Sequence, residues 1–221
     1  MISIIRHLKR FPGYIRNGLL AQKALQFFDS AGIILQPYYL VREGADLTKF
    51  DFAGDKFNEY EFRKLKSEDM KQLDHFDGRA TTENELLERL NAGHLSYGLI
   101  NKNTIVAFTW CNPSEIHHHL SIHRTLKDNE VYLYDAQSLY KFRGRGLMPY
   151  LRYKCYVALN EEGKNIFYSC SDYFNKPAIR FKKKLNADFL LVGIDIGIKK
   201  VFQKGIILKQ LGKSIYFEAA N

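Results

Sequence analysis

The chain has 221 residues, of which 46% are hydrophobic and 26% charged, as in an ordinary globular protein with a sizeable core. This length predicts one large domain, or one domain with an extension, and no internal repeat or low-complexity segment is visible. The net charge of +9, from 33 Lys and Arg against 24 Asp and Glu, suits either solubility or the attraction of an anion. Charge alone does not separate these interpretations.

Membrane-spanning and secretory segments are not expected. No apolar run is long enough to cross a bilayer, and Arg6, Lys9 and Arg10 interrupt any signal-peptide core. The three cysteines are odd in number and lack the spacing of metal ligands. A reduced, cytoplasmic protein is the interpretation that they favour.

Residues 1–55 are expected to form an N-terminal extension with a helix and an edge strand. An amphipathic pattern predicts a helix over 2–30. A strand is predicted over 33–42, and Pro37 places it at an edge because proline has no amide hydrogen to donate. The extension is expected to pack on the sheet, with an acceptor-site cover or a homodimer contact as alternatives. A linker is predicted over 51–58, so that the main domain spans 56–221.

The next fifty residues predict a strand, two helices and a hairpin. Thr82 and Glu85 have the spacing of a capping box, which predicts the start of the second helix, and Gly93 is expected to end it. The expected elements are a strand over 60–65, helices over 67–73 and 86–90, and hairpin strands over 94–100 and 104–111.

Four histidines, His117, His118, His119 and His123, raise the question of a zinc site. Three adjacent side chains of a regular strand cannot all face one point, and no second cluster of ligands lies nearby. We therefore expect no metal site and a solvated loop. As an alternative, one of these histidines could border an acceptor site as a binding or proton-transfer group.

A strand, a glycine-containing turn and a helix are predicted between residues 130 and 159. The strand is expected over 131–139, where apolar and aromatic residues are frequent. Past Gly144 and Gly146 the apolar residues recur with helical spacing. Pro149 fits only the first turn of a helix, so the helix is expected to begin close to Gly146.

This turn has the features of a phosphate-binding site. Glycines leave no side chains over the helix start, and the first amides of a helix are free to bind an anion. A pyrophosphate would rest on these amides, and two arginines would add positive charge. The residues expected to hold it are Arg143, Gly144, Arg145, Gly146, Leu147 and Met148.

The remaining residues predict a buried strand over 165–170, a helix over 175–185 and final strands over 189–198 and 206–208. The basic run 182–184 is expected to be a solvated helix face, since no aromatic stacking pattern accompanies it and nucleic-acid binding is not expected.

At these two helices the chain resembles the GNAT superfamily of N-acetyltransferases. Their acyl-CoA motif, Arg/Gln-x-x-Gly-x-Gly/Ala, is matched by Arg143 and Gly146, whereas Met148 departs from the last small residue. Their Asn-x-x-Ala-x-x-x-Tyr-x-x-Leu-Gly-Phe segment is matched at Asn175, Ala178 and Leu185. Lys182 stands in the place of the tyrosine and Asn186 in that of the glycine. The resemblance covers roughly 60–208.

The resemblance implies an α/β fold with a mixed, mostly antiparallel central sheet flanked by helices. It implies a bulge that separates the motif strand from the next strand, where the pantetheine arm of acetyl-CoA binds. Contact with this arm is assigned to Ala136, Gln137, Ser138 and Asn175, with an amide near Gln137 polarising the thioester.

The catalytic groups are less sharply defined. Glu130 stands where histone-type members carry a catalytic glutamate, and Asp135 is nearer the acyl group in sequence. Either could instead be an ordinary carboxylate at the sheet rim. Because Lys182 replaces the usual general-acid tyrosine, Tyr173 is the substitute candidate, although it is equally plausible as a packing group. Proximity and water relays would require neither a base nor an acid.

The resemblance thus implies an N-acetyltransferase that uses acetyl-CoA and the amine of a small molecule, such as an amino sugar or amino acid. The alternatives are a non-catalytic acyl-CoA-binding protein on the same fold and, third, a basic nucleic-acid-binding domain. The acceptor itself is not predicted, because acceptor loops vary freely on one fold.

Overall fold

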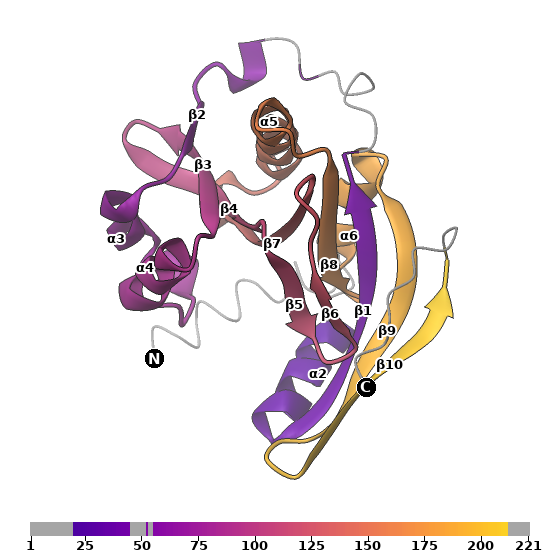
Figure 1. Cartoon of the computed structure of the whole chain (residues 1–221). Helices are drawn as coiled ribbons and strands as arrows, with labels where there is room; N and C mark the ends of the chain where they lie inside the picture. The colour runs from indigo at the N-terminus through magenta and orange to yellow at the C-terminus, as the bar shows by residue number, and fades with distance from the viewer. Residues whose placement is uncertain (1–19, 45–51, 53–54, 212–221) are drawn as a thin grey trace, which may run out of the picture.

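The computed structural model describes residues 20–44, 52 and 55–211, and all structural statements below concern these residues (Figure 1). The strands are β1 (Ile33–Glu43), β2 (Glu61–Lys64), β3 (Leu95–Asn101), β4 (Thr104–Asn112), β5 (Glu115–His119), β6 (Ile122–Thr125), β7 (Glu130–Ser138), β8 (Ile166–Asp172), β9 (Asp188–Ile198) and β10 (Phe202–Gln210). The helices are α2 (Leu20–Ser30), α3 (Met70–Leu73), α4 (Glu83–Asn91), α5 (Leu147–Glu161) and α6 (Lys176–Lys184), with single 3-10 turns at η2 (Asp55–Phe57), η3 (Ser67–Asp69), η4 (Phe76–Gly78) and η5 (Tyr140–Phe142).

Eight strands form one sheet in the order β10-β9-β1-β8-β7-β4-β3-β2. Strands β7 and β8 run parallel, while the other pairings in the described part of the chain are antiparallel. The predicted mixed, mostly antiparallel sheet flanked by helices is confirmed. In Figure 1, α3 and α4 lie near the β2–β3 end of the sheet and the β9–β10 hairpin forms the other end.

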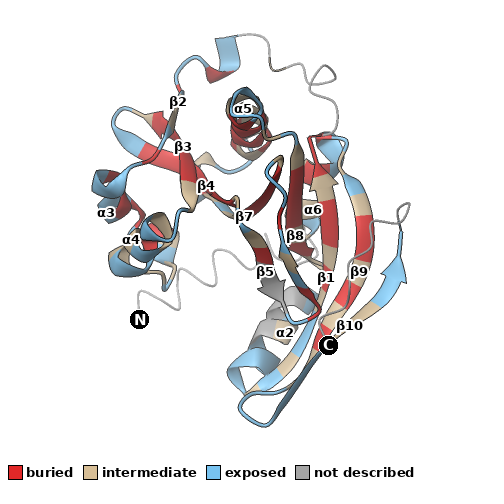
Figure 2. Ribbon diagram, viewed as in Figure 1, coloured by how far each residue is buried: buried red, intermediate tan, exposed pale blue. Residues whose placement is uncertain are grey.

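Alternate residues of β7 and β8 define the two faces of the sheet, because side chains of a strand point in alternate directions. Val131, Leu133 and Phe167 pack with α5 on one face. Tyr132 and Tyr168 pack on the other face with apolar residues of β5 and β6. Figure 2 shows buried residues concentrated in the central strands, while β10 is largely exposed.

The local signals of the sequence act as expected in several elements. Thr82 and Glu85 form the predicted capping box at the start of α4. Gly93 follows that helix with φ 83°, in the left-handed region that glycine adopts without steric cost. Helix α5 begins at Leu147, so Pro149 lies in its first turn. No helix in the described ranges is both long and apolar enough to span a membrane.

The N-terminal strand is not at an edge, contrary to the prediction from Pro37. Strand β1 lies between β8 and β9. Its pairing with β8 begins only at Tyr38, so among the described strands residues 33–37 pair with β9 alone. Pro37 lies at this junction, and its carbonyl accepts a hydrogen bond from the amide of Tyr173 at 2.9 Å. The proline is tolerated because its nitrogen points to the side where β8 has already ended.

Helix α2 accounts for the end of the helix predicted over 2–30, and the earlier residues of that prediction lie outside the described ranges. The predicted linker is described only in part. Its residue Phe57 is not free but buried in the core, where its ring stacks on Tyr150 with centroids 4.2 Å apart. The division of the chain at residue 55 stays a prediction.

Two further predictions are wrong. The histidine segment is not a loop, because β5 and β6 form a hairpin in which His117 pairs with His123. Ile116 and Ile122 of this hairpin are buried, and their burial explains why the segment is ordered into strands. Lys182 is not on a solvated helix face, since the residue is 2% exposed.

Lys182 is buried because it belongs to a charged network between the sheet and the two helices of one face. Its ammonium donates to Ser169 Oγ at 2.7 Å and lies 3.5 Å from the carboxylate of Glu43. Arg152 of α5 lies 3.4 Å from the same carboxylate. Tyr156 donates to Glu43 Oε2 at 2.5 Å, and Ser169 bonds Oε1. Glu43 of β1 thus connects β8, α5 and α6.

The charges in this network determine the ionisation of Glu43. Burial by itself would raise the pKa of this carboxyl. The positive charges of Arg152 and Lys182, with the hydrogen bonds from Ser169 and Tyr156, outweigh burial and hold the pKa below its ordinary value. The carboxylate therefore stays charged at neutral pH.

We expect Glu43→Gln to lower the free energy of unfolding by about 3–5 kcal/mol, because it leaves two buried cations without their counterion. The exposed Glu61→Gln should change it by less than about 1 kcal/mol. Since folding lowers the pKa of Glu43, its contribution is complete above the ordinary value of 4.5 and is lost as the pH falls through the folded-state pKa. Urea unfolding between pH 3 and pH 7 tests this, and equal stability of both variants would contradict it.

Candidate functional site

The candidate site is an opening between the parallel strands β7 and β8. The two strands pair only from Glu130–Ile166 to Tyr132–Tyr168. Beyond these pairs, and within the described residues, no pairing joins them, although β7 continues to Ser138 and β8 to Asp172. Parallel strands run in the same direction, so both separated ends lie at the same edge of the sheet.

A β-bulge in β7 accompanies the separation. Phe108 of β4 pairs with Gln137 and Trp110 pairs with Tyr134, so two residues of β7 lie opposite one residue of β4. The first of the two is Asp135, with φ 47°. A bulge bends the strand and leaves backbone groups unpaired. The predicted bulge in the motif strand is confirmed, and a ligand with amide groups could pair with the exposed edge.

The turn after β7 leads into the first amides of α5. Gly144 and Gly146 have φ values of 80° and 83°. Glycine adopts such positive φ values without steric cost, whereas residues with a Cβ do not. Within the part of the chain that the structure describes, no side-chain hydrogen bond caps this helix at Gly146. The helix start therefore offers free donors and the positive end of the helix dipole to an anion.

Two arginines belong to this turn, and a lysine lies beside it. Arg145 lies over the ring of Phe142, 5.0 Å from its centroid. Arg143 is partly occupied, since its guanidinium donates to Asp77 at 2.7 Å and to the carbonyl of Ser138 at 3.2 Å. The third cation is Lys56, whose ammonium lies 3.5 Å from the place that a Cβ of Gly146 would occupy.

Most of the predicted site residues meet at this end of the two strands. Ala136, Gln137 and Ser138 end β7, and the turn and first residues of α5 follow directly. Asn175 caps α6, where its Oδ1 accepts from the amide of Ala178 at 3.2 Å. Its predicted contact with pantetheine stays a prediction.

Glu130 lies at the opposite end of β7 and is buried. Arg124 donates to both of its oxygens, at 2.7 and 2.8 Å, and the amide of Lys127 donates at 2.9 Å. Tyr168 adds a hydrogen bond at 3.2 Å. These contacts favour the alternative of a structural carboxylate at the strand end, and a catalytic role for Glu130 stays a prediction.

Asp135 lies at the bulge itself, where two arginines hold its carboxylate. Arg79 and Arg89 each approach it to 2.6 Å. Arg89 also lies over the rings of Trp110 and Tyr134, at 5.4 and 5.6 Å from their centroids. The ion pairs fix the strained residue in place and occupy the oxygens that a base would need.

Tyr173, the predicted substitute acid, follows β8 and is 39% exposed. Its ring stacks on Tyr39 of β1 with centroids 4.9 Å apart. Burial, together with the neighbouring Tyr173, raises the pKa of Tyr39 to about 12. The stack supports a packing role for Tyr173, and its catalytic role stays a prediction.

Several residues at the site were not predicted from the sequence. Lys56 comes from the segment expected to be a linker, and Arg79 and Arg89 come from α4 and the loop before it. His94 and Tyr134 form a hydrogen bond across two strands. None of these residues belongs to a sequence motif, so only their positions in the folded chain bring them to the site.

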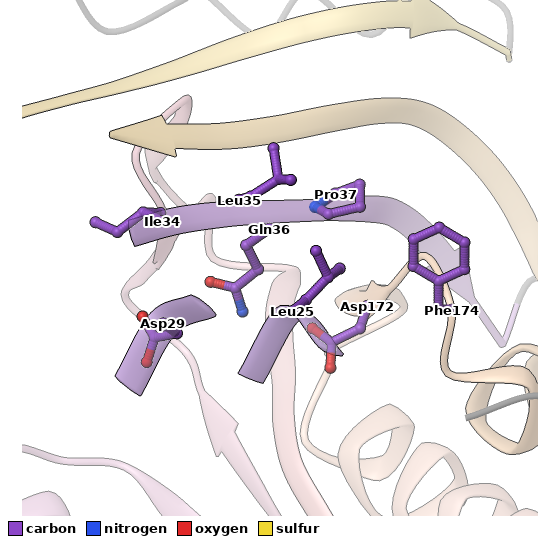
Figure 3. A pocket seen from close by; sticks show the side chains of 8 residues that line it. All are labelled: Leu25, Asp29, Ile34, Leu35, Gln36, Pro37, Asp172 and Phe174. Atoms are coloured by element: carbon purple, nitrogen blue, oxygen red, sulfur yellow. The ribbon is translucent and has the colours of Figure 1, made fainter. Parts of the chain in front are cut away.

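A separate pocket of about 150 Å³ lies between α2, β1 and the segment after β8 (Figure 3). It is lined by Leu25, Asp29, Ile34, Leu35, Gln36, Pro37, Asp172 and Phe174. The lining residues come from α2, β1, the end of β8 and the segment after it, and none belongs to β7 or to the turn before α5. Among the described residues, no group of three potential metal ligands is present.

Comparison with known proteins identifies the fold. No family model and no curated protein matches the sequence. Among solved structures, a protein assigned to the GNAT family of acetyltransferases from Novosphingobium aromaticivorans matches with a TM-score of 0.51 and 16% identity, over 72% of this chain and 63% of its own. A Drosophila protein matches with a TM-score of 0.51 and 17% identity, over 78% of this chain and 55% of its own. A conserved protein of unknown function from Staphylococcus epidermidis matches with a TM-score of 0.50 and 10% identity, over 76% and 63%.

The chain has the GNAT fold, as the two sequence motifs predicted. Because the sequence identities to these structures are only 10% to 17%, the similarity shows the fold alone. The chain also spans less than two thirds of the length of these solved structures.

The ion pairs and backbone of Asp135 can be separated by substitution. We expect Asp135→Asn to be more stable than Asp135→Ala by about 1 kcal/mol, because asparagine tolerates a positive φ and alanine does not. Both should be less stable than the wild type, since both lose the pairs with Arg79 and Arg89. Urea unfolding measures the order, and equal stability of the two variants would show that the backbone at the bulge is not strained.

Proposed function

We propose that the protein transfers an acetyl group from acetyl-CoA to the amine of a small-molecule acceptor, such as an amino sugar or an amino acid. The observation that carries the proposal is the bulged opening between β7 and β8, followed directly by a glycine turn and the free amides of α5. One continuous stretch of chain would thus provide a strand edge for the pantetheine arm of acetyl-CoA and helix amides for its pyrophosphate.

Each part of this stretch would contact a different part of acetyl-CoA. The backbone of Ala136, Gln137 and Ser138 would pair with the pantetheine arm, and the amide near Gln137 would polarise the thioester carbonyl. The amides from Gly144 to Met148 would bind the pyrophosphate. Pro149 has no amide hydrogen and contributes no donor.

Charge at this seat would come from arginines and a lysine. Arg145 and Lys56 have no carboxylate partner among the ion pairs that the structure describes. A bound phosphate would give both side chains an anionic partner. Arg143 is shared with Asp77. Three cations beside one helix start suit a ligand with two adjoining phosphates.

A non-catalytic acyl-CoA-binding protein is the second candidate. The observation that favours it is the ion pairing of both predicted carboxylates, Glu130 and Asp135, with arginines. Calorimetric titration with acetyl-CoA tests binding, and release of free thiol with a library of amines tests transfer. Binding without thiol release supports the second candidate, and no binding contradicts both.

Two other expectations belong to the proposal. A cytoplasmic location suits the free thiols of all three cysteines, of which Cys111 and Cys155 are buried. A homodimer stays a prediction.

The first binding prediction concerns Lys56. We expect Lys56→Ala to weaken acetyl-CoA binding about tenfold, as for loss of one hydrogen bond to a charged group. Binding of acetyl-pantetheine, which lacks the phosphates, should not change. Lys71→Ala on the exposed side of α3 is the matched control. Calorimetry measures the affinity of the wild type and of both variants for each ligand. Equal weakening of both ligands in Lys56→Ala would place Lys56 away from the phosphates.

The second binding prediction concerns Asn175. Asp caps a helix as well as Asn does, so Asn175→Asp should keep the stability of the protein. It removes the side-chain amide donor, so acetyl-CoA should bind more weakly by about 1–3 kcal/mol. If Asn175→Asp binds acetyl-CoA as the wild type does while Asn175→Ala only unfolds earlier, Asn175 is a helix cap and no more.

A further inference from the structure

A histidine–tyrosine pair lies on the face of the sheet that is opposite α5. His94 directly precedes β3, and its Nδ1 lies 2.5 Å from the hydroxyl oxygen of Tyr134. The two rings are almost perpendicular, with an interplanar angle of 89° and centroids 5.7 Å apart. A contact this short between side chains 40 residues apart is a directed hydrogen bond.

Within this pair, Tyr134 borders the opening. Tyr134 immediately precedes Asp135, so it is the last residue of β7 before the bulge. Both His94 and Tyr134 are only half-buried, so a ligand can approach them. Arg89 lies over the Tyr134 ring and forms an ion pair with Asp135. It therefore holds Tyr134 and Asp135 in one arrangement.

The surroundings determine which atom of the pair carries the proton. Burial lowers the pKa of His94, the charge of Arg89 on α4 lowers it further, and Glu115 on β5 opposes them. Burial raises the pKa of Tyr134, with Arg89 opposing and Asp135 reinforcing the rise. At neutral pH the imidazole is therefore neutral while the phenol keeps its proton. In the tautomer with the imidazole proton on Nε2, Nδ1 accepts the hydrogen bond from the Tyr134 hydroxyl.

We propose that Tyr134 and His94 form the proton relay that takes the proton from the attacking amine, an inference that rests on the proposed acetyl transfer. The amine lone pair attacks the thioester carbonyl carbon and forms the C–N bond. The C–S bond breaks, and its electron pair leaves with sulfur as the thiolate. The amine proton passes to the Tyr134 oxygen as the Tyr134 proton passes to Nδ1, which leaves His94 as an imidazolium. The Nδ1 proton then passes back to the Tyr134 oxygen as the proton on that oxygen passes to the thiolate, which restores the neutral His94 and Tyr134.

Kinetics with acetyl-CoA and an amine test this relay. We expect Tyr134→Phe and His94→Gln each to lower kcat about 100-fold, the usual scale for a positioned acid or base, with no change in acetyl-CoA affinity. The double variant should be no slower than the slower single variant, because both residues act in one step. Tyr97→Phe is the matched control, since the buried Tyr97 hydroxyl has no hydrogen-bond partner among the described residues. Near-normal turnover by either single variant would overturn the relay.

The pH dependence gives a second readout. For the wild type, kcat/KM should fall as the pH decreases through the pKa of His94, which lies below 6.5, because protonated Nδ1 cannot accept a proton. This step should be absent in His94→Gln. An unchanged profile in that variant would contradict the relay.

A measurement without turnover separates this inference from the proposed function. Nitrogen NMR of labelled protein should find the neutral His94 tautomer that carries its proton on Nε2, because Nδ1 accepts from Tyr134. A proton on Nδ1 would overturn the relay even in an active enzyme. Absence of thiol release with every amine would instead overturn the acetyl transfer and, with it, the relay, whereas the NMR result would still report the hydrogen bond.

Discussion

The extra residue in β7 is the constraint on which the site depends. By inserting Asp135 with φ 47°, the chain bends β7 away from β8 after three residue pairs and opens the sheet at its centre. A non-glycine residue keeps such a conformation only where its surroundings hold it. Arg79 of the loop before α4 and Arg89 of α4 do so by binding its carboxylate. Arg89 also packs on the ring of Tyr134, so one side chain stabilises both the bulge and the proposed relay.

A second interaction fixes the layers on the opposite face. Glu43 reaches from β1 into a buried network with Arg152 of α5 and Lys182 of α6. Removing these charges from water costs free energy, so the network stabilises less than its contacts suggest. Its geometric consequence is clearer: it ties to the sheet the two helices whose first turns border the opening. The N-terminal strand therefore supports the candidate site, although no residue of β1 belongs to its motifs.

The candidate site was predictable only in its contiguous parts. Gly144, Gly146 and Pro149 act through the backbone of their own turn, and the first turn of α5 has the form that they predict. The carboxylates were harder to interpret, because a residue type does not reveal its partners. Glu130 and Asp135 both carry the expected charge, but the arginines that hold them come from other elements. His94 and Tyr134 have no local signal, since their contact exists only when β3 and β7 lie near each other in the folded sheet.

The sequence by itself determined the order and type of most elements, the α5 turn and the resemblance to the GNAT fold. It did so because caps, glycine conformations and hydrophobic periodicity act between residues a few positions apart. Tertiary structure alone decided the place of β1 between β8 and β9, the hairpin of the histidine segment and the burial of Lys182. Each of these depends on a partner more than a dozen residues away or on an apolar layer above it. Pro37 shows the difference: it has no amide hydrogen in any context, but only the end of β8 decides whether that donor is needed.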